Sequence, residues 1–390
     1  MALVATVSST YLFPAAGRTA SMPIGHQFLF TSALFQMALK LKPLDQQVIV
    51  ITGATSGIGL ATAQAAHKAG ARLVLAARSQ ADLDTVARDL GSRVAVVAAD
   101  VADPAAVRRI HEAAHSHFGA LDTWVNNAGV GMWGKLEQGK LEDFKKLYDT
   151  NFWGIVNGSL EAIKHLKKHG GALINLGSVV SDVSVPIQGM YASSKHAVKG
   201  FTDALRIELA DEKAPVSVTL IKPAAINTPF PEHARNYLPE KPKLPQPVYA
   251  PEEVAKAILH AATHPVRDIY VGGGGKLMST TNKYAPGVMD WVEAKTGVAQ
   301  QKQEGTRAVD PAGSLHRPNG PHAKVRGNNP GHVMETSLYT RATLHPVLAG
   351  LAAATGLAAT IALIASRSRN GLQDSGVPAP HEMGVAVTDN

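Results

Sequence analysis

Residues 48–59 read VIVITGATSGIG, and the prediction of the fold starts from them. Val48–Ile51 is an uninterrupted run of β-branched apolar side chains, as expected for a strand buried on both faces of a parallel sheet. A helical spacing of apolar residues follows from Gly57 to about residue 69, and Gly70 ends it as a C-terminal cap. A buried strand, a glycine-rich turn and a helix form the first half of a βαβ unit.

The same alternation of short apolar runs and helical stretches continues to about residue 271. The other predicted strands are Arg72–Ala76, Val94–Ala98, Leu121–Asn126, Ala172–Leu176, Val216–Ile221 and about Asp268–Val271. The helices between them are predicted at about 80–90, 103–117, 142–168, 189–212 and 251–263. Seven strands that alternate with helices predict an α/β protein with a Rossmann-type doubly wound parallel sheet.

The glycines of the turn have the order and context of a dinucleotide-binding loop. Gly53 permits the tight turn, Gly57 lets the backbone approach a pyrophosphate, and Gly59 lets the helix pack closely on the sheet. The phosphates would then lie on main-chain N–H groups at the start of the helix, where Ser56 can add a hydroxyl donor. We therefore predict a bound dinucleotide.

The end of the second predicted strand bears on the choice of dinucleotide. A site for NAD usually has an acidic residue there, which bonds the ribose 2′-hydroxyl. Here the strand is followed by Arg78 and Ser79, and the first carboxylate is Asp82. A guanidinium at this place can form a charge-assisted fork on a 2′-phosphate, so the sequence favours NADP(H). The alternative is a solvated arginine at the start of a helix.

A second motif, Ser178 followed by Tyr191 and Lys195, predicts proton transfer. Tyr191 and Lys195 are four residues apart on one predicted helix, so both side chains project from the same face. Bringing the pKa of a phenol from near 10 to about 7 takes roughly 4 kcal/mol of preferential phenolate stabilisation. We expect the Lys195 ammonium to supply much of it, and Ser178 to stabilise charge on a substrate oxygen. Beside a dinucleotide, this is chemistry for hydride transfer at a carbonyl or alcohol.

Together these motifs resemble, in the right order, those of the short-chain dehydrogenase/reductase family, over about residues 45–271. The matching positions are Thr52–Gly59, Asp100, Val101, Asn126–Gly129, Asn151, Ser178, Tyr191 and Lys195. The resemblance implies an NADP-dependent oxidoreductase that acts on a CH–OH or C=O group. The cofactor-binding residues expected from the turn, the second strand and the resemblance are Gly53, Ser56, Gly57, Ile58, Gly59, Arg78, Asp100, Val101, Asn127, Gly129, Tyr191, Lys195, Pro223 and Thr228.

The resemblance also implies a role for each catalytic residue. Ser178 would hydrogen-bond the substrate oxygen, and Tyr191 would be the acid/base. Lys195 would bind the ribose hydroxyls. Asn151 would hold a water in a proton relay that ends at Lys195.

Other matching positions would hold the rest of the cofactor. Asp100 would bind the adenine amino group beside Val101, and Asn127 and Gly129 would lie along the cofactor. The segment Pro223–Thr228 resembles the one that holds the nicotinamide carboxamide. The family usually has Pro-Gly where this chain has Pro-Ala, which bears on the contacts there and not on the activity.

Composition limits the other kinds of chemistry. Cysteine is absent, which excludes disulfides, thiol nucleophiles and cysteine-ligated metals. The net charge of +7 lies mainly in the flanks, so we expect no nucleic acid as a partner. His111, His115 and His117 fall on one predicted helix with no carboxylate at ligand spacing. We expect them to be surface or helix-end residues, and we expect no metal.

Composition also divides the chain. Residues 1–44 are predicted to be an arm, which is either disordered or, up to residue 36, an over-extension before a natural start at Met37. Residues 45–271 form the catalytic domain, which a proline-rich insertion at 229–250, interpreted as a lid, interrupts. Residues 272–341 are predicted to be a weakly ordered basic linker, and 367–390 a polar tail.

Residues 342–366 carry no formal charge and lie between Arg341 and Arg367. A helix over 346–365 would span about 30 Å, the thickness of the hydrocarbon core of a membrane. Eight of these residues are alanine, so the gain on insertion is small. The segment is either a membrane span that anchors a cytoplasmic catalytic domain or an alanine-rich helix packed on protein.

Two other functions stay open for the same fold. A non-catalytic NADP-sensing or scaffold protein would be expected to have lost catalytic residues, and all four are present here. A sugar-nucleotide epimerase or dehydratase would need a larger C-terminal substrate domain. For the oxidoreductase we expect a small-molecule substrate and a homo-oligomer, and the aromatic residues of the insertion favour an apolar substrate.

Overall fold

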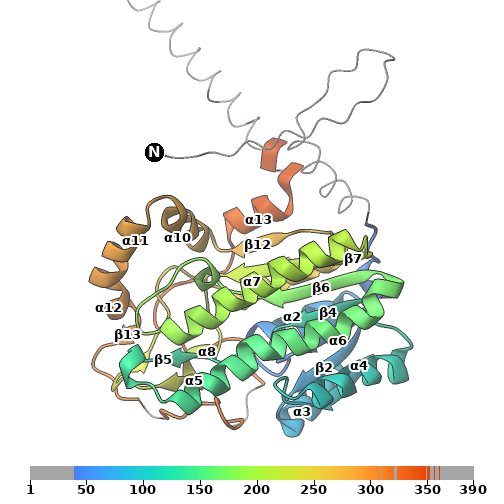
Figure 1. Ribbon diagram of the computed structural model, residues 1–390, viewed down its shortest axis with the longest axis horizontal. Coiled ribbons are helices and arrows are strands. Elements are labelled where there is room, and N and C mark those ends of the chain that lie inside the picture. Colours follow the sequence, from blue (N-terminus) through green and yellow to red (C-terminus); the bar gives the residue numbers. More distant parts are fainter. Residues whose placement is uncertain are drawn as a thin grey trace, which may run out of the picture. The chain divides into compact units, whose positions relative to one another are not determined.

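The computed structural model describes residues 39–308, 310–319, 323–347 and 349–351, together with 355 and 360. Its centre is a seven-stranded parallel sheet with the strand order β12-β7-β6-β4-β1-β2-β3 (Figure 1). The strands are β1 Val48–Thr52, β2 Arg72–Ala77, β3 Val94–Ala98, β4 Thr123–Asn126, β6 Gly171–Leu176, β7 Val216–Pro223 and β12 Asp268–Val271. The predicted doubly wound α/β fold is confirmed.

The strand order places a crevice at the carboxyl end of β1. This strand pairs with β2 on one side and β4 on the other, with Ile49 opposite both Leu73 and Thr123. The chain therefore builds the sheet outward in both directions from β1. In doubly wound sheets, ligands bind where the strand order reverses in this way.

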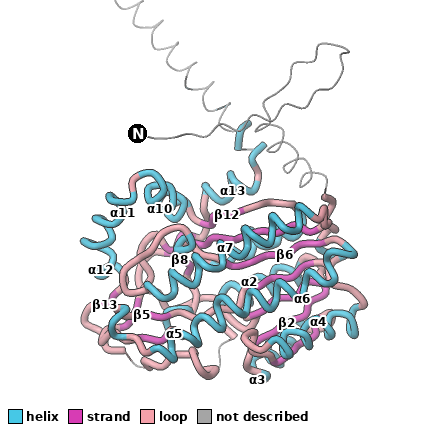
Figure 2. The backbone as a smooth tube through the Cα atoms, in the orientation of Figure 1, coloured by secondary structure: helices cyan, strands magenta, loops and turns pink. Residues whose placement is uncertain are grey.

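Helices cover both faces of the sheet, which lies between them in Figure 2. They are α2 Gly57–Lys68, α3 Gln80–Leu90, α4 Pro104–Phe118, α5 Leu141–Tyr148, α6 Gly154–His169, α7 Gly189–Asp211 and α9 Pro251–Thr263. Ile49 and Ile51 point to the face covered by α2, α3 and α9, whereas Val48 and Val50 point to the face covered by α4, α6 and α7. All four are fully buried, which explains why this strand is apolar throughout.

One predicted helix is interrupted. The stretch predicted as a single helix at 142–168 is α5, a π-helical turn over Asp149–Trp153, and α6. The turn holds Asn151, whose side chain bonds the main chain of Val130 at both its amide and its carbonyl. The spacing of apolar residues cannot predict hydrogen bonds of this kind between a side chain and the main chain. π turns are frequent at functional sites.

The insertion at 229–250 is organised by short strand pairs. It contains α8 Phe230–His233, β9 Arg235–Asn236, β10 Lys241–Pro242 and β11 Val248–Tyr249. β9 pairs with β5 (Met132–Trp133), and β11 pairs with β8 (Ala225–Ile226). The insertion is thus tied to the ends of the main sheet.

The residues after Gly272 contain more regular structure than composition suggested. They form α10 Gly273–Tyr284, α11 Pro286–Val292, a π turn at Glu293–Gly297, α12 Val298–Gln300, β13 Lys302–Gln303, β14 Val333–Met334 and α13 Leu338–Leu344. β13 pairs with β10, and β14 pairs with β11. A few buried apolar residues, such as Met289 and Leu315, fix this segment to the domain, and such sparse anchors give no periodic signal.

Within the described residues, no helix has both the length and the hydrophobicity needed to cross a membrane. The predicted apolar helix at 346–365 lies mostly outside the described residues. Residues 1–38 of the arm predicted at 1–44, and the whole of the tail predicted at 367–390, also lie outside them. The membrane span therefore stays a prediction.

Candidate active site

A pocket with a cavity volume of about 420 Å³ lies at the carboxyl ends of the central strands. It brings together most of the residues predicted for the site. Those that line it are Gly53, Ser56, Gly57, Ile58, Arg78, Asp100, Val101, Asn127, Gly129, Ser178, Tyr191, Lys195, Pro223 and Thr228. Gly59 and Asn151 support the pocket from behind its lining.

The glycine loop has the backbone conformation that the sequence predicted for the turn and for the start of the helix. Gly53 and Gly57 have positive φ angles of 65° and 54°, which favour glycine. A Cβ on Gly59 would collide with the carbonyl oxygen of Gly53, so the helix can start this close to the strand only with glycine there. A Cβ on Gly57 would lie 3.1 Å from the Cβ of Thr228, which closes the loop on its other side.

Asn127 braces the loop from the neighbouring strand. Its side-chain amide donates to the carbonyl oxygens of Thr52 at 2.9 Å and Gly53 at 3.1 Å. The main chain of Ala128 donates to the Thr52 hydroxyl at 3.1 Å. These bonds fix the ends of β1 and β4 relative to each other, and therefore the shape of the pocket between them.

Tyr191 and Lys195 project from the same face of α7 into the pocket. The Lys195 Nζ lies 5.8 Å from the centroid of the Tyr191 ring and donates to the carbonyl oxygen of Leu176 at 2.8 Å. Ser178 lies just beyond β6, where its hydroxyl accepts from the main-chain N–H of Val180 and also hydrogen-bonds Tyr191. Strand β6 and helix α7 thus bring the three side chains together.

The protonation of the pair differs from the sequence-based expectation. Burial raises the pKa of Tyr191 to about 12, against a smaller lowering by the hydrogen bond from Ser178. Burial also lowers the pKa of Lys195 to about 8. The expectation that Lys195 brings the phenol towards 7 is wrong for this arrangement, because the ammonium is directed at the Leu176 carbonyl. At neutral pH Tyr191 carries its proton.

Asn151 is completely buried beneath the pocket. Its Oδ1 accepts from the main-chain N–H of Val130 at 2.8 Å, and its Nδ2 donates to the Val130 carbonyl at 2.9 Å and to the Ser194 hydroxyl at 3.2 Å. The side chain therefore holds the segment after β4 in place. The proton-relay water at Asn151 stays a prediction.

Arg78 and Asp100 lie at the other end of the pocket and already have protein partners. The Arg78 guanidinium donates to the carbonyl oxygen of Leu315 at 3.2 Å and to that of Ser314. Asp100 accepts from Lys146 at 2.9 Å and from the main chain of Ala102. Burial, partly offset by the charge of Asp100, lowers the pKa of Arg78.

The sequence did not predict that the segment after Gly272 would contribute to the pocket. Its contributions to the lining are Gly274, Gly275, Met278, Glu293, Gly297, Gln300, Gln301, Ser314, Pro318 and Asn319. The main-chain N–H of Gly57, in the glycine loop, donates to the carbonyl oxygen of Lys324 at 2.9 Å. From the insertion, the ring of Phe230 lies 5.4 Å from that of Tyr191. Of these contributions to the pocket, the sequence indicated only that of the aromatic residues in the insertion.

Known proteins match this architecture. The family model described as short chain dehydrogenase matches residues 47–237. The chain is 43% identical over 340 residues to the uncharacterized oxidoreductase YxnA of Bacillus subtilis, covering 84% of this chain and 95% of that protein. It is 32% identical over 289 residues to 11-beta-hydroxysteroid dehydrogenase A of Sesamum indicum, covering 68% of this chain and 81% of that protein.

A solved structure gives the same result for the fold. A short-chain dehydrogenase/reductase from Burkholderia phymatum in complex with NAD superposes with a TM-score of 0.57 at 26% identity, covering 64% of this chain and 96% of that one. The chain belongs to the short-chain dehydrogenase/reductase family. It is an oxidoreductase of the kind that acts on CH–OH and C=O groups, on a fold that implies a nicotinamide cofactor.

Proposed function

We propose that this protein transfers hydride between NADP(H) and the carbonyl or alcohol group of a small apolar substrate. The observation that carries the proposal is the convergence of Ser178, Tyr191 and Lys195 in the pocket that also contains the glycine loop. The nicotinamide would supply or accept the hydride. The protein's own residues then have to hold the substrate oxygen and move one proton.

Tyr191 would move that proton. Because its pKa is raised to about 12, the phenol is protonated at neutral pH and can donate to the substrate oxygen as C=O becomes CH–OH. The reverse reaction returns the proton to the phenolate. Ser178, already hydrogen-bonded to Tyr191, would hold the same oxygen and stabilise the charge that develops on it. Lys195 would bind the ribose hydroxyls.

The preference for NADP(H) rests on Arg78. It lines the pocket just beyond the end of β2, where an NAD site usually has a carboxylate. A 2′-phosphate there would form charge-assisted hydrogen bonds with the guanidinium. To do so it would share or replace the carbonyl oxygens of Ser314 and Leu315 as partners.

The apolar nature of the substrate is proposed from the residues around Tyr191. Val185, Phe230 and Met278 line this end of the pocket, with the fully buried Trp133 behind Phe230. Apolar and aromatic side chains around a few polar groups are typical of sites for small organic ligands. The relative from Sesamum indicum is named a hydroxysteroid dehydrogenase, so hydrophobic alcohols and ketones are the first compounds to try.

A panel of ketones and alcohols, followed by NADPH absorbance, tests the proposal. We expect turnover of at least one apolar member, with a preference for NADPH over NADH. Tight NADPH binding without turnover of any member would instead favour the non-catalytic NADP-sensing protein.

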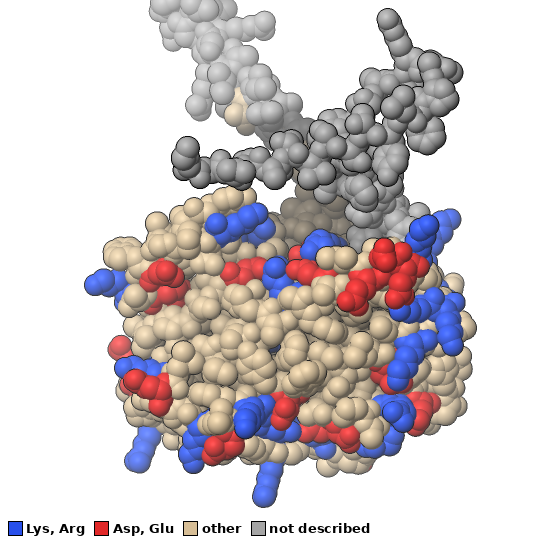
Figure 3. All heavy atoms as spheres, viewed as in Figure 1, with Lys and Arg blue, Asp and Glu red and all other residues tan. Residues whose placement is uncertain are grey.

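We also propose that the protein forms a homo-oligomer through α6 and α7. Leu160 and Ile207 are 47% and 67% exposed on these helices, and Trp153, just before α6, is 51% exposed. Figure 3 views the molecule from the side of α6 and α7, and the middle of this surface consists largely of uncharged residues. Exposed apolar side chains on a surface with few charges favour association there.

A further inference from the structure

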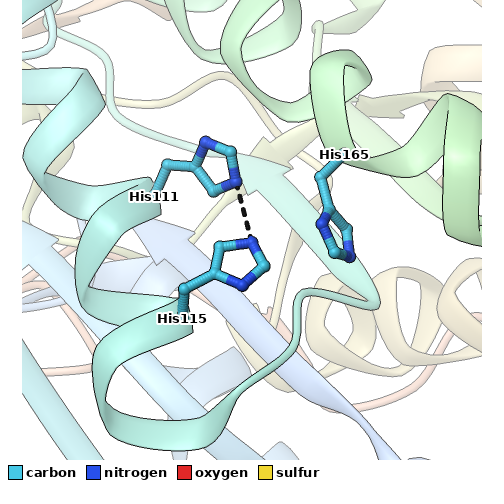
Figure 4. A group of neighbouring side chains, drawn as sticks. All are labelled: His111, His115 and His165. Atoms are coloured by element: carbon cyan, nitrogen blue, oxygen red, sulfur yellow. Dashed lines mark hydrogen bonds between the residues drawn. The ribbon is translucent and has the colours of Figure 1, made fainter.

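Three histidines on two neighbouring helices form a cluster outside the pocket. His111 and His115 are four residues apart on α4, so their side chains lie on one face of that helix. His165 comes from α6, which packs beside α4 on the same face of the sheet. Figure 4 shows the three rings between the two helices. One ring nitrogen from each lies within 4.8 Å of the other two.

The first two rings already have the spacing of metal ligands. The Nε2 atoms of His111 and His115 are 3.1 Å apart. In a tetrahedral zinc site with Zn–N bonds of about 2.0–2.1 Å, two ligand nitrogens are roughly 3.3 Å apart. An ion held by both rings would replace the hydrogen bond between them, once each ring has turned so that its lone pair points at the ion. Rotation of the His165 ring about its side-chain bonds would close the remaining distance.

A carboxylate fixes the orientation of His111. The Nδ1 of His111 lies 2.8 Å from Glu161 Oε1, and both side chains are largely buried, with exposed fractions of 15% and 11%. Glu161 is in turn held by Lys164 at 2.6 Å. A proton on Nδ1, shared with the carboxylate, leaves the lone pair of Nε2 directed at His115. Histidines that bind metals commonly have this carboxylate behind them.

The surroundings of His115 and His165 favour the neutral imidazole, the form that binds a metal. Burial, together with the nearby His169, His115 and His111, lowers the pKa of His165 to about 4, and Asp122 opposes this shift. Burial and the nearby His111 and His169 also lower the pKa of His115. The ring of His169 stacks on that of His165, and the two ring centroids are 4.2 Å apart.

We propose that His111, His115 and His165 bind one divalent transition-metal ion of the zinc type. Three imidazoles favour Zn²⁺, Ni²⁺ or Cu²⁺ over Mg²⁺ and Ca²⁺, which prefer oxygen ligands. A water completes the tetrahedron. The sequence offered only the trio on α4, including the exposed His117, and it could not show that His165 and Glu161 come from the next helix.

The place of the cluster assigns the ion a structural role. Helices α4 and α6 run antiparallel to the strands, and the three histidines lie in the second half of each helix. The cluster is therefore near the amino ends of the strands, whereas the pocket is at their carboxyl ends. A bound ion links α4 to α6 and takes no part in hydride transfer.

The test is metal binding by the full chain, without a histidine tag, using Co²⁺ as a spectroscopic probe and Zn²⁺ in thermal denaturation. We expect one Co²⁺ per chain with the visible absorption of a tetrahedral site. Saturating Zn²⁺ should displace it and raise the Tm by roughly 3–8 °C. His115→Ala and His165→Ala should each weaken Co²⁺ binding by at least about 100-fold.

Matched variants locate the site among the 16 histidines of the chain. His117→Ala, on the same helix, should bind as the wild type does, and so should His260→Ala, which removes a ring from a separate stacked pair with His264. NADPH binding by every variant reports that it is folded. Absence of Co²⁺ binding by the wild type at 100 µM free ion, or equal binding by His115→Ala, would overturn the proposal. If His260→Ala were the only variant to lose Co²⁺ binding, the ion would bind elsewhere, and this result would also overturn the proposal.

Discussion

Lys195 is held in the pocket at a cost to the stability of the fold. Burial lowers its pKa from 10.5 to about 8. Below pH 8 the side chain is charged in both the native and the unfolded state, so the native state bears the full cost of burying the charge. Between pH 8 and 10.5 only the unfolded state keeps the proton, and the contribution of Lys195 to the free energy of unfolding rises with pH.

Lys195→Met should therefore stabilise the protein while it abolishes activity. We expect the free energy of unfolding to increase on the order of 1–3 kcal/mol at pH 7, and the gain to shrink as the pH approaches 10.5. Urea denaturation of both proteins at pH 7 and pH 10 measures this. A variant less stable than the wild type at pH 7 would show that the hydrogen bond to Leu176 outweighs the cost of burial.

Arg78 should set the choice between the two cofactors. Loss of a charge-assisted bond to phosphate costs about 1.5–3 kcal/mol, so Arg78→Ala should bind NADPH roughly 10 to 150 times more weakly, with little change for NADH. Fluorescence titration measures both affinities, with Arg88→Ala, exposed on α3, as the control. Equal losses for both cofactors would mean that Arg78 only anchors Ser314 and Leu315.

The segment after Gly272 should control cofactor affinity. Leu315 is fully buried against Val130, Met132 and Leu147, and its carbonyl accepts from Arg78. Leu315→Ala should cost about 2–5 kcal/mol of stability and weaken NADPH binding at temperatures where the variant is folded. Leu338→Ala, 82% exposed on α13, should change neither. Unaltered NADPH affinity in folded Leu315→Ala would remove this segment from the cofactor site.

Some parts of the fold and of the candidate site could be predicted from the sequence, and others could not. The seven strands and the glycine loop were predictable because each has a local signature: apolar runs for buried strands, and glycines where a Cβ would collide. The grouping of Ser178, Tyr191 and Lys195 followed from their spacing around one strand and one helix. Other features join residues that are distant in the chain, so no periodic pattern predicts them. They are the partners of Arg78, the contacts of Asn151 and the approach of His165 to His111.

For the whole molecule, we predict self-association through α6 and α7. Ile207→Lys puts a charge in the exposed apolar surface of α7, and it should shift the protein towards monomer because a buried unpaired charge is costly. Sedimentation velocity measures the assembly state. Leu277→Lys, with a similar exposure of 69% on α10, is the control and should leave it unchanged. A wild type that is monomeric at all concentrations would contradict the prediction.

The acid/base role of Tyr191 is tested by comparing Tyr191→Phe with the wild type, using NADPH and the best substrate from the panel. The substitution keeps the ring that packs near Phe230 and removes only the proton that is transferred. We predict that turnover falls by at least about 10²-fold while NADPH affinity stays within about twofold. Turnover close to that of the wild type would contradict the assignment of Tyr191 as the acid/base, and with it the proposed mechanism.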